Sequence, residues 1–484
     1  CTEGAPEDPL PPPGSPPPVG PASPLFRAEL RNLDVADVER IIAQGVAEAG
    51  ARGAPATFAV VDRVGNVLGV FAMTGAPSTT QIRSHASGPD TGLQGVDVPS
   101  TLAAIAKAIT GAYLSSGGNA FSSRTASMIV QEHFPPAPST VGLESGPLFG
   151  VQFSQLPCSD LNTRFVSGGA RIGPQRSPLG LSGDPGGLPL YKDGFVVGGV
   201  GVVSDGDYGI DTNVLDVDTD AEELIAVAAS TGFAAPAAIR AEEIAVDGTT
   251  LRFTDKDVAD LATNPATAPA FATINGVAGA LVDVPAYYDG FSMGNVVFAG
   301  QSFGAEASGV RQATVGEYAN SDIFVLSNGV GANRYPPIAG SDSATVLSPL
   351  TATEVRAILE EAFAVMTAAR GQIRRPLNSR AQVTISVVDT NGAILGIVRG
   401  PDAPVFGTDV SLQKARTAAF FSASVAAADL LGTVPPAIVL PNPTKSVPSF
   451  VPDVRAFIPD PTALTGAIAF SDRAGGNLSR PYFP

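Results

Sequence analysis

Thr57-Phe-Ala-Val-Val-Asp62-Arg-Val-Gly65-Asn-Val-Leu-Gly69-Val70 decides the fold of this chain, because its pattern returns as Thr384-Ile-Ser-Val-Val-Asp389-Thr-Asn-Gly392-Ala-Ile-Leu-Gly396-Ile397. In each copy, an apolar run rich in β-branched residues leads into a turn that contains glycine, and a second apolar run follows. This pattern predicts two antiparallel strands joined by a tight turn. Because the pattern occurs twice, we expect two similar structural units in one chain.

Helices are predicted on both sides of each hairpin. Before the first hairpin, Asp34 is a suitable N-cap for a helix whose apolar residues recur at helical spacing up to Ala49. Before the second hairpin, Thr351-Ala-Thr-Glu354 forms a capping box ahead of a similar apolar pattern. After each hairpin a further helix is expected, one over Ser100–Leu114 and one around Lys414-Ala415. The repeated unit therefore consists of a helix, two strands and a second helix.

The first unit continues with a hairpin that has no counterpart in the second. Leu188–Tyr191 and Phe195–Val203 flank Lys192-Asp193-Gly194, which is a clear hairpin signal, and a short helix near Asp220–Ser230 follows. An open sheet edge in an otherwise complete domain is unfavourable. We therefore expect either that the natural chain continues past Pro484 or that a neighbouring subunit supplies the missing strands.

These patterns predict an α+β protein with two repeated domains, each an antiparallel β-sheet flanked by α-helices. We assign residues 28–215 to the first domain, which contains a long insertion, and residues 347–484 to the second, which is C-terminally incomplete. Residues 216–346 match neither unit and are interpreted as an irregular inserted or bridging region.

The N-terminal residues 1–27 are predicted to form a tether. Ten of the first 24 residues are proline, and such a composition stays extended and buries no core. The sequence begins at Cys1, a pattern typical of a mature lipoprotein whose first cysteine carries the lipid; an arbitrary start of the sequence is the alternative. We therefore expect an exported protein, anchored through this lipid at the outer membrane or cell surface.

The formal net charge of −17 argues against nucleic acid and against anionic membrane surfaces as partners. Apolar residues make up 44% of the chain, which is enough to bury real cores. No apolar run approaches the ~18 residues of a membrane-spanning helix. If Cys1 carries a lipid, Cys158 is the only free thiol, and no internal disulfide is available.

Four motifs together carry a family resemblance. They are Val60-Val61-Asp62 with Gly65, Val387-Val388-Asp389 with Gly392, Lys414-Ala415-Arg416-Thr417, and Gly-Gly-Leu-Pro-Leu at 186–190 followed by Val-Gly-Gly-Val-Gly at 197–201. In these motifs the chain resembles the GlcG/HbpS-like haem-binding family, which includes the C-terminal domain of PduO-type proteins. The resemblance implies an antiparallel sheet with helices on its faces, frequent oligomerisation, and binding of haem or a related tetrapyrrole. Some members of the family are described as haem-degrading.

Haem iron is usually held by His, Met, Cys or Tyr side chains. The chain has only two histidines, His85 and His133, and both lie in the first unit. Together with Tyr113 and Met128 they are the candidate haem ligands, so haem would bind through the first domain. Covalent c-type attachment is excluded because no C-x-x-C-H motif occurs. The alternatives are a solvated loop residue for His85 and a capping or packing role for His133.

Two further motifs have simpler interpretations. Gly300-Gln301-Ser302-Phe303-Gly304 fits the G-x-S-x-G nucleophile pattern, but no histidine follows Ser302, as that hydrolase fold requires. A glycine-rich turn is the alternative. The glycines in Gly198–Gly201 do not form a phosphate loop and indicate close approach of backbones inside a sheet.

A run of alternating carboxylates extends from Asp205 to Asp220 and would suit calcium, which prefers oxygen ligands. The EF-hand register fails, because Ile210 or Ala221 stands where glycine is required. Asp218 and Asp220 also suit the start of the helix that follows, where negative charge is favourable. No metal ligand is assigned.

Two classes of function remain. The first is a cell-envelope lipoprotein that binds haem or a related tetrapyrrole non-covalently. The second is a structural or assembly component of an extracellular or outer-surface oligomer that uses the two domains as a scaffold. The first class predicts saturable haem binding, and the second predicts a homo-oligomer or a complex with another envelope protein. No catalytic residue is assigned.

Overall fold

The protein is described by a computed structural model that covers residues 31–83, 93–131, 133–136, 146–151, 156, 159, 172–246, 248–284, 294–433, 446–472 and 474. The predictions for Cys1, His85, Cys158 and the tether over residues 1–27 lie outside the described residues. In the described part of the chain, no helix combines the length and the apolar character needed to cross a membrane.

The first unit contains the elements that its sequence predicts. Helix α1 begins after Asp34, whose carboxylate accepts a hydrogen bond from the Asp37 amide, and it ends at Gly53 in the left-handed conformation. The described helices and strands of this unit are α1 (Val35–Arg52), β1 (Thr57–Asp62), β2 (Val67–Met73), β3 (Thr79–Ile82), β4 (Asp97–Pro99), α2 (Ser100–Leu114), α3 (Ser123–Val130), β5 (Gly187–Lys192), β6 (Phe195–Val203), β7 (Asp207–Tyr208) and α5 (Ala221–Ala229).

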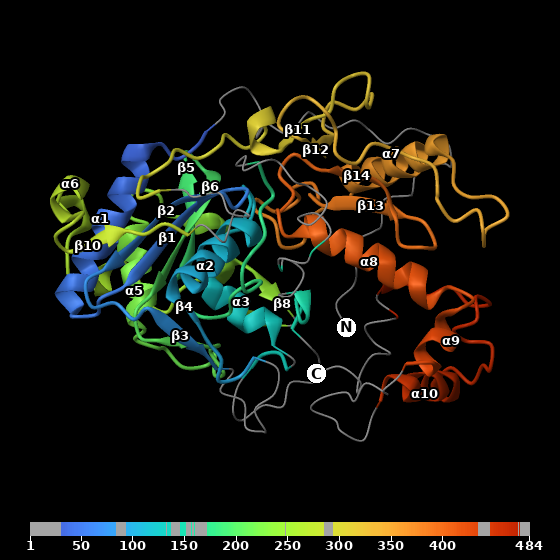
Figure 1. The fold of residues 1–484 in the computed structure, drawn as a ribbon, viewed down its shortest axis with the longest axis horizontal. Helices are drawn as coiled ribbons and strands as arrows, with labels where there is room; N and C mark the ends of the chain where they lie inside the picture. Colours follow the sequence, from blue (N-terminus) through green and yellow to red (C-terminus); the bar gives the residue numbers. More distant parts are fainter. Residues whose placement is uncertain are drawn as a thin grey trace, which may run out of the picture.

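A five-stranded sheet in the order β10-β2-β1-β6-β5 forms the centre of the first unit, with β10 spanning Gly279–Leu281. Helix α2 covers one face of this sheet, and α1 and α5 pack together on the other (Figure 1). A Cβ atom on Gly199 would lie 2.1 Å from the carbonyl oxygen of Ala108, and one on Gly201 would lie 2.1 Å from that of Ala104. The predicted close approach at these glycines is therefore confirmed, and it lets α2 press against β6.

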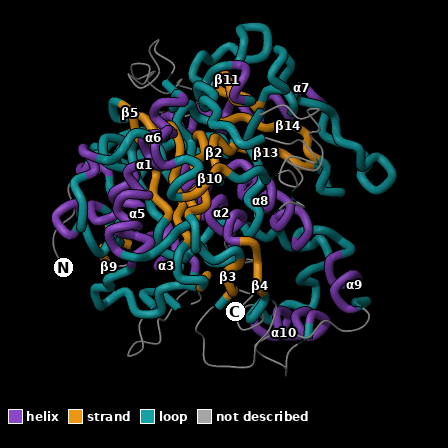
Figure 2. The backbone as a smooth tube through the Cα atoms, turned by 60° about the vertical axis from the view of Figure 1, so that its left-hand side comes forward, coloured by secondary structure: helices purple, strands orange, loops and turns teal. Residues whose placement is uncertain are grey.

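The second unit repeats the helix-strand-strand-helix arrangement around a four-stranded sheet in the order β11-β12-β14-β13. Helix α7 packs against β14 and α8 packs against β13, and Figure 2 shows the two sheets as separate groups of strands. The elements are β11 (Val310–Gln312), β12 (Phe324–Leu326), α7 (Ala352–Ala368), β13 (Thr384–Val388), β14 (Ile394–Arg399), α8 (Gly407–Phe421), α9 (Ala426–Leu431) and α10 (Phe450–Phe457).

Residues 216–346 contribute strands to the sheets of both units. Strand β10 pairs with β2 of the first unit, and β12 pairs with β14 of the second, so equivalent strands receive equivalent neighbours. The same region also contains α6 (Phe271–Ile274) and the short hairpin of β8 (Ala245–Val246) and β9 (Thr249–Thr250). The sheets thus take strands from a region that neither copy of the sequence pattern includes.

The repeated aspartate closes its turn in the same way in both units. One Oδ1 atom of Asp62 accepts hydrogen bonds from the amides two and four residues later, and Asp389 does the same. The second carboxylate oxygen binds an extended segment from residues 294–346, through the Gln301 amide in the first unit and the Ser341 amide in the second. This contact is part of the repeat, although the two segments share little sequence.

The two units meet where the β1–β2 turn contacts the loop after β14. Asp402 accepts hydrogen bonds from Arg63 at 2.9 Å, from Arg374 at 2.7 Å and from the amide of Gly117. Among the described residues, the two sheets differ at the edge that follows the repeated hairpin, because β1 lies between β2 and β6 whereas β13 pairs with β14 alone. At the other edge, β11 extends the second sheet beyond β12. Whether the natural chain continues past Pro484 or another subunit covers that edge stays a prediction.

Candidate functional site

The structure places Tyr113 in the core of the first unit. Its side chain is fully buried, and its hydroxyl lies 2.8 Å from the carbonyl oxygen of Val64 and 2.5 Å from that of Gln175. This position ties the end of α2 to the turn that follows β1. The geometry favours a packing role for Tyr113 over ligation of an iron.

The other candidate haem ligands lie in different environments. Met128 is buried on α3 within the same hydrophobic core as Tyr113. His133 lies just beyond the end of α3 and is exposed, and His85 lies outside the described residues. Of the four candidates, and within the described part of the chain, His133 is therefore the one whose side chain is accessible to a ligand from solution.

A buried charge cluster lies under α2, around a lysine within this otherwise apolar helix. The Lys107 ammonium is fully buried and contacts both Glu222 and Asp184, the latter at 2.5 Å. It also donates to the carbonyl oxygens of Pro185 and Val202 at 2.8 and 2.9 Å. These contacts join α2 to β6, to the start of α5 and to the segment before β5.

The Lys107 cluster holds more negative than positive charge. Burial alone would lower the pKa of Lys107, but Asp184 and Glu222 outweigh it and raise that pKa above its usual value. Burial raises the pKa of both carboxyls, and Lys107 offsets this effect only in part. The cluster ties together elements of the first unit, and its lysine is held protonated, which is the wrong state for a nucleophile or general base.

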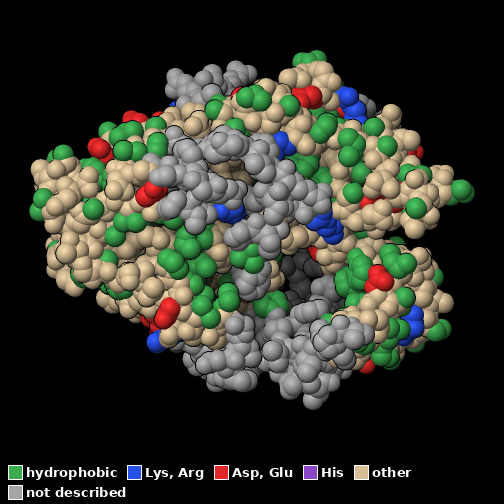
Figure 3. Space-filling model, in the orientation of Figure 1, with side chains coloured by type: hydrophobic (Ala, Val, Ile, Leu, Met, Phe, Trp, Pro, Cys, Tyr) green, Lys and Arg blue, Asp and Glu red, His purple; other side chains and the backbone are tan. Residues whose placement is uncertain are grey.

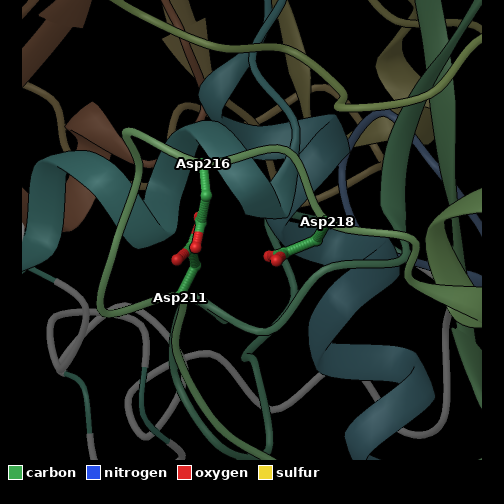
Figure 4. A group of neighbouring side chains, drawn as sticks. All are labelled: Asp211, Asp216 and Asp218. Carbon is green, nitrogen blue, oxygen red and sulfur yellow. The ribbon is translucent and has the colours of Figure 1, made fainter.

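The predicted acidic run forms a real cluster. Figure 4 shows Asp211, Asp216 and Asp218 turned toward one another, and one oxygen of each lies within 4.8 Å of the others. The guanidinium of Arg124, however, lies 2.9 Å from Asp211 and 3.2 Å from Asp218. Arg124 also contacts Glu223 at 2.5 Å. Because a buried arginine already neutralises part of this charge, the cluster by itself supports no metal assignment.

The G-x-S-x-G segment is not a nucleophile elbow but leads into a turn, in which the Ala305 amide donates to the Ser302 carbonyl oxygen. Its first residues contact the segment before α1 and the end of β1, since the Gly300 amide donates to the Leu33 carbonyl oxygen and the Gln301 amide to Asp62. The hydroxyl of Ser302 lies 3.2 Å from the side-chain oxygen of Asn32. This segment holds the turn after β1, which agrees with the simpler of the two interpretations.

Sequence reasoning missed the buried arginines at the junction between the units. Arg63, Arg374 and Arg399 are all buried near Asp402, although the motif that contains Arg63 assigned it no role and the other two stand outside every motif. One signal was available for Arg399, because it directly follows the apolar run of β14 and therefore continues a fully buried strand. No local pattern connects it with Arg63, which lies in the other unit.

Comparison with known proteins finds one family match. The family of haem-degrading HbpS-like proteins matches residues 358–451, which contain β13, β14, α8 and α9 of the second unit. No curated protein matches the chain.

Several solved structures are similar to part of the chain. A complex of PduOC with haem is 16% identical, with 42% of this chain and 96% of that chain covered and a TM-score of 0.24. A double mutant of HbpS from Streptomyces reticuli is 18% identical, with 44% and 95% covered and a TM-score of 0.23. The protein ORFY from Klebsiella pneumoniae is 16% identical, with 43% and 96% covered and a TM-score of 0.20. We draw no functional argument from similarities at this level.

The family match and the candidate ligands lie in different units. Residues 358–451 contain no histidine, tyrosine or cysteine, and Met366 is buried with its sulfur 3.4 Å from the amide of Val383. Both histidines belong to the first unit. The chain thus combines an HbpS-like second unit that is poor in iron ligands with a similar first unit that contains the histidines.

Proposed function

We propose that the chain binds haem or a related tetrapyrrole non-covalently through its first unit. The observation that carries this proposal is the HbpS-like match in the second unit, together with the same helix-strand-strand-helix arrangement in the first. The first unit adds the hairpin of β5 and β6 and contains both histidines.

Among the described residues, His133 is the side chain that would bind the iron of a haem. Its side chain is exposed, so a planar ligand can approach it without disturbing the buried core. Tyr113 and Met128 would support the site only indirectly, through the packing of α2 and α3. A bound haem would supply an iron centre, and the residues of this chain would position it and limit access of water.

Titration with haemin tests this proposal. We expect a saturable shift of the Soret band in the wild-type chain, a weaker or displaced band in His133→Ala, and a distinct spectrum in His133→Met, which keeps a possible ligand atom. His85→Ala is measured in parallel, and Arg356→Ala, on the surface of α7, is the control. If binding is not saturable, or if neither histidine variant changes the spectrum, haem ligation by these residues is wrong.

A second candidate function is a structural one, as an assembly component. It is favoured by the second unit, which lacks histidine and whose described sheet ends on β13 with a single neighbour. Strand β13 contains no charged residue and no proline, which are the usual protections of a free edge. An unprotected edge of this kind suits pairing with another chain.

Light scattering across a range of protein concentrations tests the assembly function. We expect a stable oligomer that a lysine at the exposed position directly before β13, introduced as Val383→Lys, dissociates. Ser343→Lys is the control, because Ser343 is exposed and lies away from β13 in the sequence. The nearby Ser341 is unsuitable, because it binds Asp389. A strict monomer at every concentration would count against self-assembly.

Lipid attachment at Cys1, and with it export to the outer membrane or cell surface, stays a prediction. Mass spectrometry of the protein purified from its native membranes tests it, since a lipidated cysteine adds the mass of its acyl chains. An unmodified Cys1 in that material would contradict anchoring.

A further inference from the structure

The junction between the two units gathers basic side chains in the interior. Arg63 comes from the β1–β2 turn, Arg374 from the segment after α7, and Arg399 from the end of β14. They are 3%, 6% and 0% exposed, respectively. On the face shown in Figure 3, by contrast, basic side chains stand singly at the surface. Buried cations are stable only when paired, so the partners of these three groups must be accounted for.

One carboxylate serves this group of arginines. Asp402 binds Arg63 through Oδ1 and Arg374 through Oδ2, and both oxygens also accept from the Gly117 amide. Asp62 precedes Arg63 but is committed to its own turn and to the Gln301 amide. Asp402 is therefore the carboxylate that pairs with this group in the described part of the chain, and a single carboxylate cannot neutralise three guanidinium groups.

Arg399 has the poorest compensation of the three. Its Nη2 donates to the carbonyl oxygen of Ala403, and its Nη1 lies 3.4 Å from the Thr408 hydroxyl, so the partners that the structure gives it are neutral. Burial first, and the charge of Arg63 second, lower the pKa of Arg399 to about 9. A guanidinium in this position favours an additional negative charge nearby.

The same three side chains also retain unused donors. The Nε atoms of Arg63, Arg374 and Arg399 are all buried without a hydrogen-bond acceptor. Arg63 and Arg399 both lie against the ring of Phe303, with their guanidinium carbons 3.9 and 5.5 Å from its centre. The missing component is therefore both an anion and a hydrogen-bond acceptor.

We propose that this junction is a binding site for an oxyanion, with phosphate as the preferred ligand. Arginine donors match the oxygens of phosphate and carboxylate groups better than any other side chain does. Arg399 and the unused Nε donors would bind the oxyanion, while Asp402 keeps Arg63 and Arg374 in place. Because the arginines come from both units, the bound anion would strengthen the contact between them.

Thermal unfolding in inorganic phosphate tests the site. At constant ionic strength, exchange of chloride for phosphate should raise the Tm of the full chain by about 2–5 °C and saturate, because a ligand of the native state stabilises it. An acetate series distinguishes a carboxylate site, which would give an equal or larger shift, from the phosphate site proposed. Arg356→Gln, on the surface of α7, is the control and should respond as the wild type does.

Two variants should change the phosphate-specific shift in Tm in opposite directions. Arg399→Gln should lose the phosphate-specific shift, whereas Asp402→Asn should enlarge it, because removal of the carboxylate increases the uncompensated positive charge. The second variant decides the question if Arg399→Gln fails to fold. The proposal is overturned if the wild type shows no phosphate-specific shift, if acetate acts equally well, or if the shift in Asp402→Asn is equal to or smaller than that of the wild type.

Discussion

At the scale of single residues, the two copies of the repeated aspartate differ in the direction in which their pKa is shifted. Asp62 is fully buried, and burial raises its pKa to about 6 in spite of its hydrogen bonds with Asn66 and Gln301. At Asp389, burial also acts to raise the pKa, but hydrogen bonds from Ser341 and from its own turn outweigh it and lower the pKa. The pKa of the same residue type at the same turn is therefore raised in one unit and lowered in the other.

This difference predicts opposite effects on the pH dependence of stability. Because the folded-state pKa of Asp62 exceeds the unfolded value of ~3.9, its contribution is complete below about pH 4 and is lost as the pH rises through 6. Asp62→Asn should remove this loss of stability at higher pH. It should also lower the free energy of unfolding by about 1–3 kcal/mol at pH 5, because the side-chain amide cannot accept hydrogen bonds from all four donors.

Asp389→Asn is the matched control, because it changes the same position of the other unit. The folded-state pKa of Asp389 is lowered, so its contribution is present above about pH 4 and is lost as the pH falls. Urea unfolding of the three proteins between about pH 2 and 8 measures both slopes. Equal pH dependence of Asp62→Asn and the wild type would contradict the raised pKa.

At the scale of elements, the packing of α2 on β6 depends on glycines that the second unit does not need. A side chain at Gly199 or Gly201 would meet the backbone of α2, which has no freedom to move away, because α2 also covers β1 and β5. The hairpin of β5 and β6 and the helix α2 therefore form one packed layer. Helix α8 lies on β13 without such a hairpin in the described residues, and its central residues are only half-buried.

Gly199→Ala should destabilise the chain by about 1–3 kcal/mol or more, because the new methyl group would lie 2.1 Å from the Ala108 carbonyl oxygen. Gly50→Ala, in the last turn of α1, is the control: it has open space around it and should stabilise by about 0.5–1 kcal/mol. Denaturant midpoints measure both changes. A neutral effect of Gly199→Ala would mean that α2 and β6 are not in close contact.

At the scale of the whole molecule, the two units are joined by the ion pair of Arg63 with Asp402 and by hydrogen bonds from the segment after α7. Arg374 of the second unit binds Asp402 and also donates to the Ser116 hydroxyl of the first, and the Arg375 amide binds the carbonyl oxygen of Gly118. Removal of Arg374 takes buried hydrogen bonds from Asp402 and Ser116, although Arg63 still pairs with Asp402.

Arg374→Met should therefore lower the free energy of unfolding by about 1–3 kcal/mol and separate the unfolding of the two units into distinct transitions. Arg380→Met is the control, since Arg380 pairs with Asp322 near the surface within the second unit and should cost under about 1 kcal/mol. Calorimetry resolves the transitions. A single transition with unchanged enthalpy in Arg374→Met would show that the junction does not couple the units.

Much of the local structure could be predicted because it follows from short-range patterns. The hairpin at Asn391-Gly392, the capped helices α1 and α7, and the glycine-rich strand β6 all lie where the sequence places them. The candidate site was predicted less completely. Tyr113 and His133 are both residues that can bind iron, and only their burial distinguishes them.

The sequence by itself determined the duplicated helix-strand-strand-helix unit, since periodicity, caps and turn residues act over a few positions. The tertiary structure alone decided that β10 and β12 complete equivalent sheet positions, that Tyr113 is buried, and that three arginines meet around Asp402. These outcomes depend on contacts between distant segments, and on the low polarity of the interior that those contacts create. Burial and long-range pairing set pKa, accessibility and charge balance, and no local pattern encodes them.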